Sequence, residues 1–247
     1  LADIKKAYKK GMETNDQSML GIVLESAIPG SRSIDLINKD LMQFQADPSD
    51  SNFLLVTGHS KVRSETIWKA VKAAPPKRIQ PVGLSVLEVL LGIRKYRQMV
   101  APTIAHVEQE HKSQLDQWPN KKSLKRIQAI NAAVSSKLNA GLGKAMKIVF
   151  PTQAAQANAQ TMPGGGKRKF SSHEARAAAS NASYEMYGSG KSIDLFLKQS
   201  LNHHNTGSVV HYKGISFNKP EQGVKPSSVL IEKVAGLIVQ VEDMKVE

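Results

Sequence analysis

The chain contains no cysteine, few aromatic residues and no long apolar run. The absence of cysteine among its 247 residues excludes disulfide bonds, a cysteine nucleophile and thiolate metal sites. Because only 5% of the residues are aromatic, a core has to be built mainly from aliphatic side chains. No run of about 18 apolar residues occurs, which predicts that the chain has no transmembrane helix. The opening LADIKKAYKK lacks Met and the apolar segment of a signal peptide, so we expect a fragment of a longer protein.

Acidic residues are also scarce relative to basic ones. The chain has 34 Lys and Arg against 21 Asp and Glu, a formal net charge of +13. Such an excess attracts polyanions, among them nucleic acid, acidic membrane surfaces and acidic proteins. The hydrophobic fraction of 40% is sufficient for a folded core. We therefore expect a folded basic protein, and the alternative is a basic protein with no role on nucleic acid.

Apolar residues recur at helical spacing along most of the chain, which predicts a mainly helical fold. In the helix that starts at Leu84, we expect Leu87, Leu91 and Ile93 to share one side. The expected helices cover residues 15–28, a short segment capped by Ser33, a segment from 84 onward, and residues 102–117, 123–150, 172–187, 191–201 and 227–243.

The apolar period changes in one region. Residues 53–56 form a short apolar run that predicts a strand, and residues 78–82 are its expected antiparallel partner across a long basic tip. The polar, Gly-rich stretch 151–169 predicts a flexible loop. Together these patterns indicate an α+β fold that is mainly α with a small antiparallel β-sheet.

Five short motifs carry residue types suited to phosphoryl transfer. In chain order they are Gly30-Ser31-Arg32, Thr57-Gly58-His59-Ser60-Lys61, His173-Glu174-Ala175-Arg176, Leu201-Asn202-His203-His204, and Tyr212 nine positions after His203. Each motif alone is weak, because short matches arise by chance. Their order, their spacing and the elements expected around them resemble the tyrosine recombinase (phage integrase) family over roughly residues 15–215. The resemblance implies the catalytic-domain fold of that family.

The same resemblance implies site-specific cleavage and rejoining of DNA strands through a covalent 3′-phosphotyrosyl intermediate, with no cofactor and no metal. The implied catalytic residues are Arg32, Lys61, His173, Arg176, His203 and Tyr212. Tyr212 is the implied nucleophile, and a phenol with a usual pKa of about 10 needs a base or an electropositive site to attack. Arg32 and Arg176 suit a clamp on the phosphate, because a guanidinium binds phosphate oxygens bidentately and stays charged.

The remaining roles also come from the resemblance. His203 adds a donor to the phosphate oxygens, His173 is the acid–base partner, and Lys61 protonates the departing 5′-oxygen. Two assignments stay open: His204 adjoins His203, and the tip that holds Lys61 also holds Lys69, Lys72 and Lys77.

The chain departs from the family pattern at two positions. Asn202 stands where the family usually has Gly, and Asp35 stands where it often has Glu. Asn tolerates the left-handed conformation better than most residues, so the first departure is mild. The family usually has an upstream helical domain that completes the clamp around DNA, and we expect such a domain to belong to the longer protein.

A narrower resemblance concerns the protelomerases, the hairpin telomere resolvases of linear phage plasmids. It rests on the stretches 57–64, 182–186 and 211–213. That subfamily often replaces the first His of His-x-x-Arg, whereas His173 is retained here. A protelomerase that uses the same chemistry is therefore an alternative to a recombinase or integrase.

Basic clusters outside the motifs are candidates for contacts with the DNA backbone, and the alternative reading of each is a solvated basic face. The candidates are Lys121, Lys122, Lys125, Arg126, Lys167, Arg168 and Lys169. Two further functions remain open on charge alone: a non-catalytic basic DNA-binding protein, and a nucleocapsid-type protein that coats nucleic acid.

The expected organisation is a catalytic domain over residues 1–220 and a tail helix over residues 221–247. The tail has an apolar stripe that packs on its own domain or docks on a neighbouring protomer. The expected partner is double-stranded DNA, bound by a dimer or tetramer of the chain. We expect a cytoplasmic location for a bacterial or phage protein, or a nuclear one for a eukaryotic host or virus.

Overall fold

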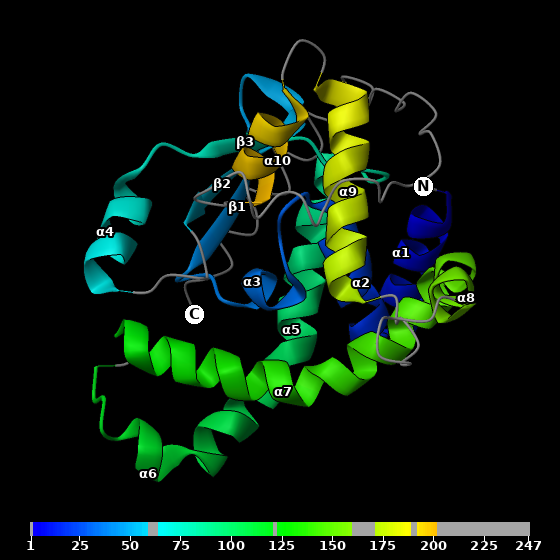
Figure 1. Ribbon diagram of the computed structural model, residues 1–247. Coiled ribbons are helices and arrows are strands. Elements are labelled where there is room, and N and C mark those ends of the chain that lie inside the picture. The colour runs from blue at the N-terminus through cyan, green and yellow to red at the C-terminus, as the bar shows by residue number, and fades with distance from the viewer. Residues whose placement is uncertain (1, 59–63, 121–122, 160–170, 189–191, 202–247) are drawn as a thin grey trace.

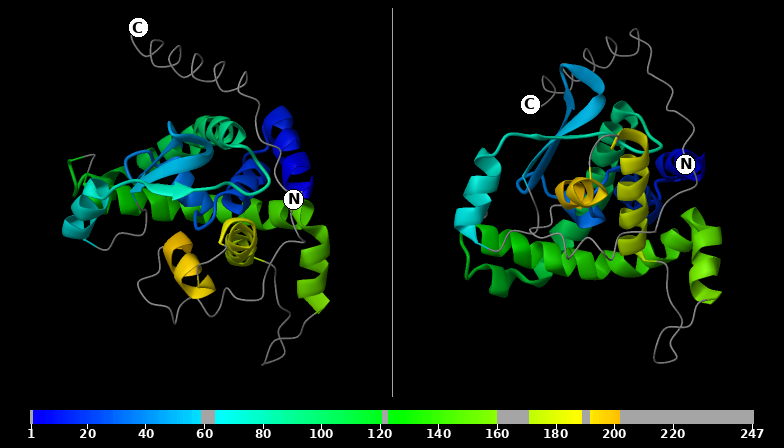
Figure 2. Two further views of the ribbon diagram at one scale, coloured as in Figure 1. Left: turned by 90° about the horizontal axis from the view of Figure 1, so that it is seen from above. Right: turned by 45° about the horizontal axis from the view of Figure 1, so that its top comes forward.

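The computed structural model describes residues 2–58, 64–120, 123–159, 171–188 and 192–201. Helices of these segments surround a central helix, α2, and the strands form a small sheet to one side of it (Figures 1 and 2). In chain order they are α1 (Ala2–Thr14), α2 (Gln17–Ala27), α3 (Ser33–Ile37), β1 (Met42–Asp47), β2 (Asp50–Gly58), α4 (Glu65–Ala73), β3 (Lys77–Ile79), α5 (Val86–Glu110), α6 (Lys112–Leu115), α7 (Leu124–Val149), α8 (Pro151–Ala159), α9 (Ser172–Tyr187) and α10 (Ile193–Leu201). The expected α+β class, mainly helical with a small antiparallel sheet, is confirmed.

Helix α2 is the core of the fold. Asp16 caps its start, because the carboxylate accepts a 2.9 Å hydrogen bond from the backbone N–H of Met19. Every residue from Met19 to Ala27 is buried. A helix that is apolar on all sides has to be surrounded, and α1, α5, α7 and α9 all pack against this one. Glu25 is the one charged residue of α2, and it is buried with its apolar neighbours.

The sheet has three antiparallel strands in the order β1-β2-β3. The expected pairing of the second and third strands is confirmed, with Leu54 opposite Ile79 and Val56 opposite Lys77. The sequence prediction missed β1, whose alternation of polar and apolar residues in MQFQAD is typical of a half-buried strand. It also read residues 65–73 as part of a hairpin tip, whereas they form helix α4, capped by Ser64.

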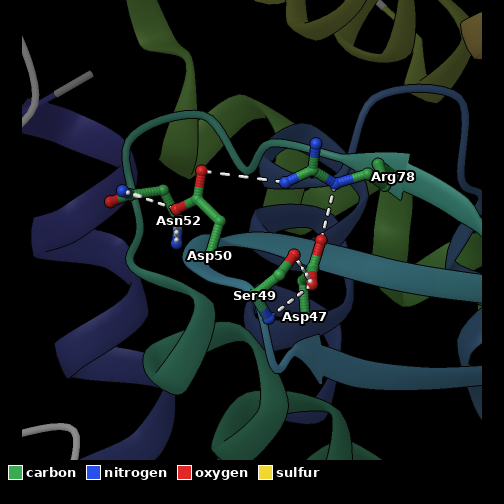
Figure 3. A network of polar contacts seen from close by, with 5 residues as sticks. All are labelled: Asp47, Ser49, Asp50, Asn52 and Arg78. Atoms are coloured by element: carbon green, nitrogen blue, oxygen red, sulfur yellow. Dashed lines mark hydrogen bonds and ion pairs between the residues drawn. The ribbon is translucent and has the colours of Figure 1, made fainter.

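A network of polar contacts holds the β1–β2 turn against β3 (Figure 3). Arg78 of β3 donates from Nε to Asp47 Oδ2 at 2.5 Å, and its Nη2 lies 3.7 Å from Asp50 Oδ2. Asp47 also accepts bonds from the backbone N–H and the hydroxyl of Ser49. These hydrogen bonds lower the pKa of the Asp47 carboxyl. The network fixes one end of β2, and the opposite end leads into the segment that contains Lys61.

Helix α5 joins the helical part to the sheet. Its Arg97 donates from Nε to the carbonyl of Leu36 at 2.7 Å and from Nη2 to the carbonyl of Met42 at 3.2 Å, so one side chain links α3 to β1. Two expectations for this region were wrong. Residues 86–110 form one helix with Pro102 inside it, rather than two helices. Its buried face carries Val86, Val89, Ile93, Tyr96, Val100 and Val107, while Leu91 is 47% exposed.

Three other expectations have clear outcomes. Helices at 123–150, 172–187 and 191–201 are confirmed as α7, α9 and α10. Ser33 is not a cap, because Arg32 holds the N-cap position of α3 with extended backbone. The loop expected at 151–169 begins instead with helix α8, for which Pro151 is a favourable first residue. The tail at residues 221–247 lies outside the described residues, so the division into a domain and a tail stays a prediction.

Candidate active site

The first candidate arginine sits on the tight turn that follows α2. Gly30 adopts φ = +82°, a left-handed conformation that favours glycine, and the N–H of Ser31 bonds to the carbonyl of Ile28 at 3.1 Å. This turn reverses the chain so that Arg32 opens α3. Pro29 and Gly30 thus lie between the end of α2 at Ala27 and the start of α3 at Ser33, six positions later.

Arg32 is held by a carboxylate one turn further along α3. Its Nε lies 3.2 Å from Asp35 Oδ2 and its Nη2 lies 3.0 Å from Asp35 Oδ1, a bidentate arrangement. The backbone N–H of Arg32 donates to the same Asp35 Oδ2 at 3.0 Å. The Asp35 side chain is 3% exposed and that of Arg32 is 31% exposed. The carboxylate therefore fixes the plane of a guanidinium that still reaches the surface.

The second candidate arginine comes from α9. Glu174 caps this helix by accepting from the backbone N–H of Ser171 at 2.6 Å. The face of α9 that packs on the core carries small residues, and Ala175, Ala178, Ala179 and Ala182 belong to the main core. Small side chains let two helix backbones approach closely, which brings α9 beside α2.

Arg176 projects from α9 onto the turn that carries Arg32. Its Nε donates a 2.8 Å hydrogen bond to the carbonyl oxygen of Gly30, although the two residues are 146 positions apart in the sequence. The structure therefore brings together the Gly30-Ser31-Arg32 turn and the His173-x-x-Arg176 helix. His173 is the second residue of α9, three positions before Arg176.

A buried carboxylate completes this cluster, and the sequence prediction missed it. Glu25 is 2% exposed, and its Oε2 accepts a 3.0 Å hydrogen bond from the backbone N–H of Ser33. The pKa of Glu25 is raised to about 7, chiefly by burial; the bonds from Ser33 and the charge of Arg176 oppose the rise, and the charge of Asp35 adds to it. The available signal was a single charged residue inside the apolar run 17–31.

Two other motifs begin on described elements and continue outside the described residues. Thr57-Gly58 ends β2, where Gly58 has φ = +91° and a Cβ would collide with the carbonyl oxygen of Leu41. Leu201 ends α10, a helix that packs on α9 through Leu197 against Ala177 and through an edge-to-face contact of Phe196 with Tyr184. Lys61, His203, His204 and Tyr212 lie outside the described residues.

Of the three alternative lysines of the tip, two lie on α4, whereas Lys77 begins β3 and pairs with Val56 of β2. Lys69 and Lys72 lie on α4, and the Nζ of Lys72 sits 4.1 Å from the ring centroid of Trp68. Trp68 packs against Leu41, Leu124 and Ile127. Helix α4 is therefore seated at the start of α7, at one edge of the molecule and apart from α9 (Figures 1 and 2). This placement separates Lys69 and Lys72 from Arg176.

Two of the candidate DNA-contacting residues are described. Lys125 is exposed in the first turn of α7. Arg126 is 11% exposed, donates from Nη1 to the carbonyl of Leu115 at 2.8 Å and lies near Glu108, so it anchors the α6–α7 connection. The other candidates, Lys121, Lys122, Lys167, Arg168 and Lys169, lie outside the described residues.

Neither a metal-binding cluster nor a membrane-spanning helix occurs among the described residues. Among those residues no group of three or more His, Asp or Glu side chains is arranged to hold a metal ion. None of the helices described is both long and apolar enough to cross a membrane.

Comparison with solved structures identifies the fold. The chain is similar to "protelomerase TelK complexed with substrate DNA", with a TM-score of 0.62 and 14% sequence identity. The similarity covers 91% of this chain and 38% of the other protein, so the chain spans well under half of that protein's length. No family model and no curated protein matches the sequence. The tyrosine recombinase catalytic-domain fold is thereby confirmed.

Proposed function

We propose that the chain cleaves and rejoins DNA strands through a covalent 3′-phosphotyrosyl intermediate on Tyr212. The observation that supports this proposal is the 2.8 Å hydrogen bond from Arg176 Nε of α9 to the carbonyl oxygen of Gly30, in the turn that leads to Arg32. The fold similarity to a protelomerase solved with its substrate DNA supports the same chemistry. The net charge of +13 suits a polyanionic substrate.

The proposed chemistry is a displacement at phosphorus. The Tyr212 phenolate oxygen attacks the scissile phosphorus, the bond from phosphorus to the 5′-oxygen breaks, and Lys61 supplies the proton that this oxygen takes up. His173 receives the phenol proton. Negative charge gathers on the nonbridging oxygens, where Arg32, Arg176 and His203 stabilise it. Rejoining is the reverse displacement by a 5′-hydroxyl, so the phosphodiester is conserved and no external energy source is consumed.

The nucleophile is tested with supercoiled plasmid DNA, a substrate that reports strand cleavage without knowledge of a target sequence. The chain is incubated with plasmid, quenched with detergent and analysed for protein-linked DNA. We expect Tyr212→Phe to bind the plasmid as the wild type does and to form no adduct. Tyr187→Phe, a half-buried tyrosine of α9, is the matched control and should retain the adduct. An adduct that persists in Tyr212→Phe contradicts the assignment.

Hairpin formation is a second candidate, favoured by the structural similarity to a protelomerase. The two candidates share the cleavage step and differ in the strand that receives the 3′-phosphate. A hairpin-forming enzyme joins each strand to its own complement, so its linear products snap back to duplex after denaturation. A recombinase joins strands of two partner duplexes and leaves products that separate on denaturation. Denaturing electrophoresis of linear reaction products distinguishes them.

DNA contacts outside the active site are proposed for the surface formed by α4 and the first turn of α7. Lys69, Lys72 and Lys125 are exposed there, around the contact of Trp68 with Leu124. A row of ammonium groups binds phosphates without reading sequence. We further propose that two or four copies of the chain assemble on the DNA, as strand exchange between duplexes requires.

A further inference from the structure

Glu25 is a buried charge that the proposed chemistry does not use. It occupies a helix in which every other residue from Met19 to Ala27 is apolar or small, and it is 2% exposed. A carboxylate in such surroundings is costly unless partners compensate its charge. The groups that compensate the charge of Glu25 are residues around the two candidate arginines, so its position points to a role at the candidate site.

The groups that face Glu25 come from three helices, α3, α5 and α9. The backbone N–H of Ser33 bonds to Oε2 at 3.0 Å, directly after Arg32 in the chain. The charges of Asp35 on α3 and Arg176 on α9 both act on the carboxyl. Tyr96 on α5 is fully buried, and the Glu25 charge adds to the burial that raises the pKa of its phenol.

We propose that Glu25 is a positioning residue for the arginine pair, and that its ionisation sets the net positive charge which Arg32 and Arg176 present to a phosphate. The carboxylate holds the Arg32 turn through the Ser33 N–H. It holds Arg176 by charge, and Arg176 in turn bonds to Gly30 of that turn. The role rests on the proposed function, and Glu25 itself does not touch DNA.

A dependence on pH follows from this arrangement. With a pKa of about 7, Glu25 exchanges its proton in the neutral range. Ionisation lowers the net charge of the cluster by one and so weakens its attraction for a phosphate. A phosphate bound between the arginines opposes that ionisation, so binding at the clamp is linked to uptake of a proton by Glu25.

The test compares wild type with Glu25→Gln in adduct formation on supercoiled plasmid, at about pH 6 and about pH 8. Gln keeps an oxygen that accepts from Ser33 and lacks the charge. We expect the ratio of the wild-type rate to the Glu25→Gln rate to fall about fivefold from about pH 6 to about pH 8, because only the wild type gains a negative charge near the phosphate as the pH rises. Glu88→Gln on α5 is the matched control, with a ratio that does not change with pH.

A second measurement decides the inference if the chain forms no adduct. The melting temperatures of Glu25→Gln, Arg176→Ala and the double variant are compared at about pH 8, where Glu25 is ionised. We expect the double variant to lose less than the sum of the two single losses. Additive losses, or a rate ratio that is constant with pH, overturn the role of Glu25. The wild type could form no adduct while the losses in melting temperature are still non-additive. That outcome overturns the proposed function, but it leaves the coupling of Glu25 to Arg176 intact.

Discussion

Arg176 binds the carbonyl oxygen of Gly30 through its Nε, across 146 positions of sequence. A guanidinium held at Nε has its plane fixed, which orients the two Nη groups proposed to bind the phosphate. The acceptor belongs to the same turn as Arg32, so a displacement of that turn moves both arginines together.

The first prediction concerns Arg176→Lys. Lysine keeps the positive charge, but it has no Nε donor and no planar fork, so it cannot hold Gly30 and a phosphate at the same time. We expect adduct formation on supercoiled plasmid to fall about 100-fold, with DNA affinity nearly unchanged. Arg94→Lys on the exposed face of α5 is the control, and we expect it to keep the wild-type rate. Equal rates for both variants would exclude Arg176 from the clamp.

The second prediction concerns stability against pH. The pKa of Glu25 is raised from 4.5 to about 7 in the folded protein, so the folded state binds this proton more tightly than the unfolded state. Its contribution to stability is complete below about pH 4.5 and is lost as the pH rises through about 7, a change of roughly 3 kcal/mol.

Urea unfolding of wild type and Glu25→Gln at several pH values measures this change. We expect the free energy of unfolding of the wild type to fall relative to that of the variant over the same range. Glu13→Gln, at an exposed position of α1, is the control and should shift the free energy by less than about 0.5 kcal/mol. A constant difference between wild type and Glu25→Gln would show that the carboxyl titrates normally.

The third prediction compares two glycines. Gly58 ends β2 with φ = +91°, and a Cβ there would meet the carbonyl oxygen of Leu41, so we expect Gly58→Ala to lose at least about 2 kcal/mol of stability. Gly143 lies inside α7 with open space where a Cβ would be, so Gly143→Ala should gain about 0.5–1 kcal/mol. Thermal unfolding of both variants measures the contrast, and a similar effect of the two substitutions would contradict it.

The fourth prediction concerns the surface of α4 and α7. Lys69→Glu combined with Lys125→Glu should reduce the slope of log affinity against log salt for duplex DNA by about 2, since each lost phosphate contact removes about 0.9. The fold should tolerate the change, because both side chains are exposed and a Glu is favourable in the first turn of α7. The matched control is Lys9→Glu combined with Lys10→Glu on α1. An equal reduction of the salt slope in this control would indicate a general effect of net charge and would contradict a specific DNA contact at α4 and α7.

Helix positions were the most predictable part of the fold from the sequence. The run around Met19–Ala27 and the long segment 124–149 have apolar patterns and clear caps at Asp16 and Ser123, so local signals were enough. Strand β1 and helix α4 were missed because the polar residues of MQFQAD and the basic residues around Trp68 resemble a loop until β2 and α7 pack against them. Strand β1 and helix α4 are stabilised by tertiary contacts, and these cannot be predicted from the local sequence pattern.

The sequence predicted the two arginines of the site, but it did not predict the buried residue that lies behind them. The order and spacing of the motifs selected Arg32 and Arg176, and in the structure Arg176 of α9 bonds to Gly30 in the turn that leads to Arg32. Glu25 could not be selected in the same way, because its meaning depends on Ser33 and Arg176 lying beside it in space. The pairing of Arg32 with Asp35 is local, within one helical turn, and its geometry follows from the sequence.

The small side chains on the inner face of α9 have a consequence for motion. Alanines bury little apolar area, so the attachment of α9 to α2 contributes less free energy than the leucine and isoleucine contacts of the core. We expect the amide hydrogens of α9 to exchange with solvent through local opening well before those of α2. One arginine thus follows the fully buried helix α2 and the other belongs to α9, so we expect local opening of α9 to separate the pair.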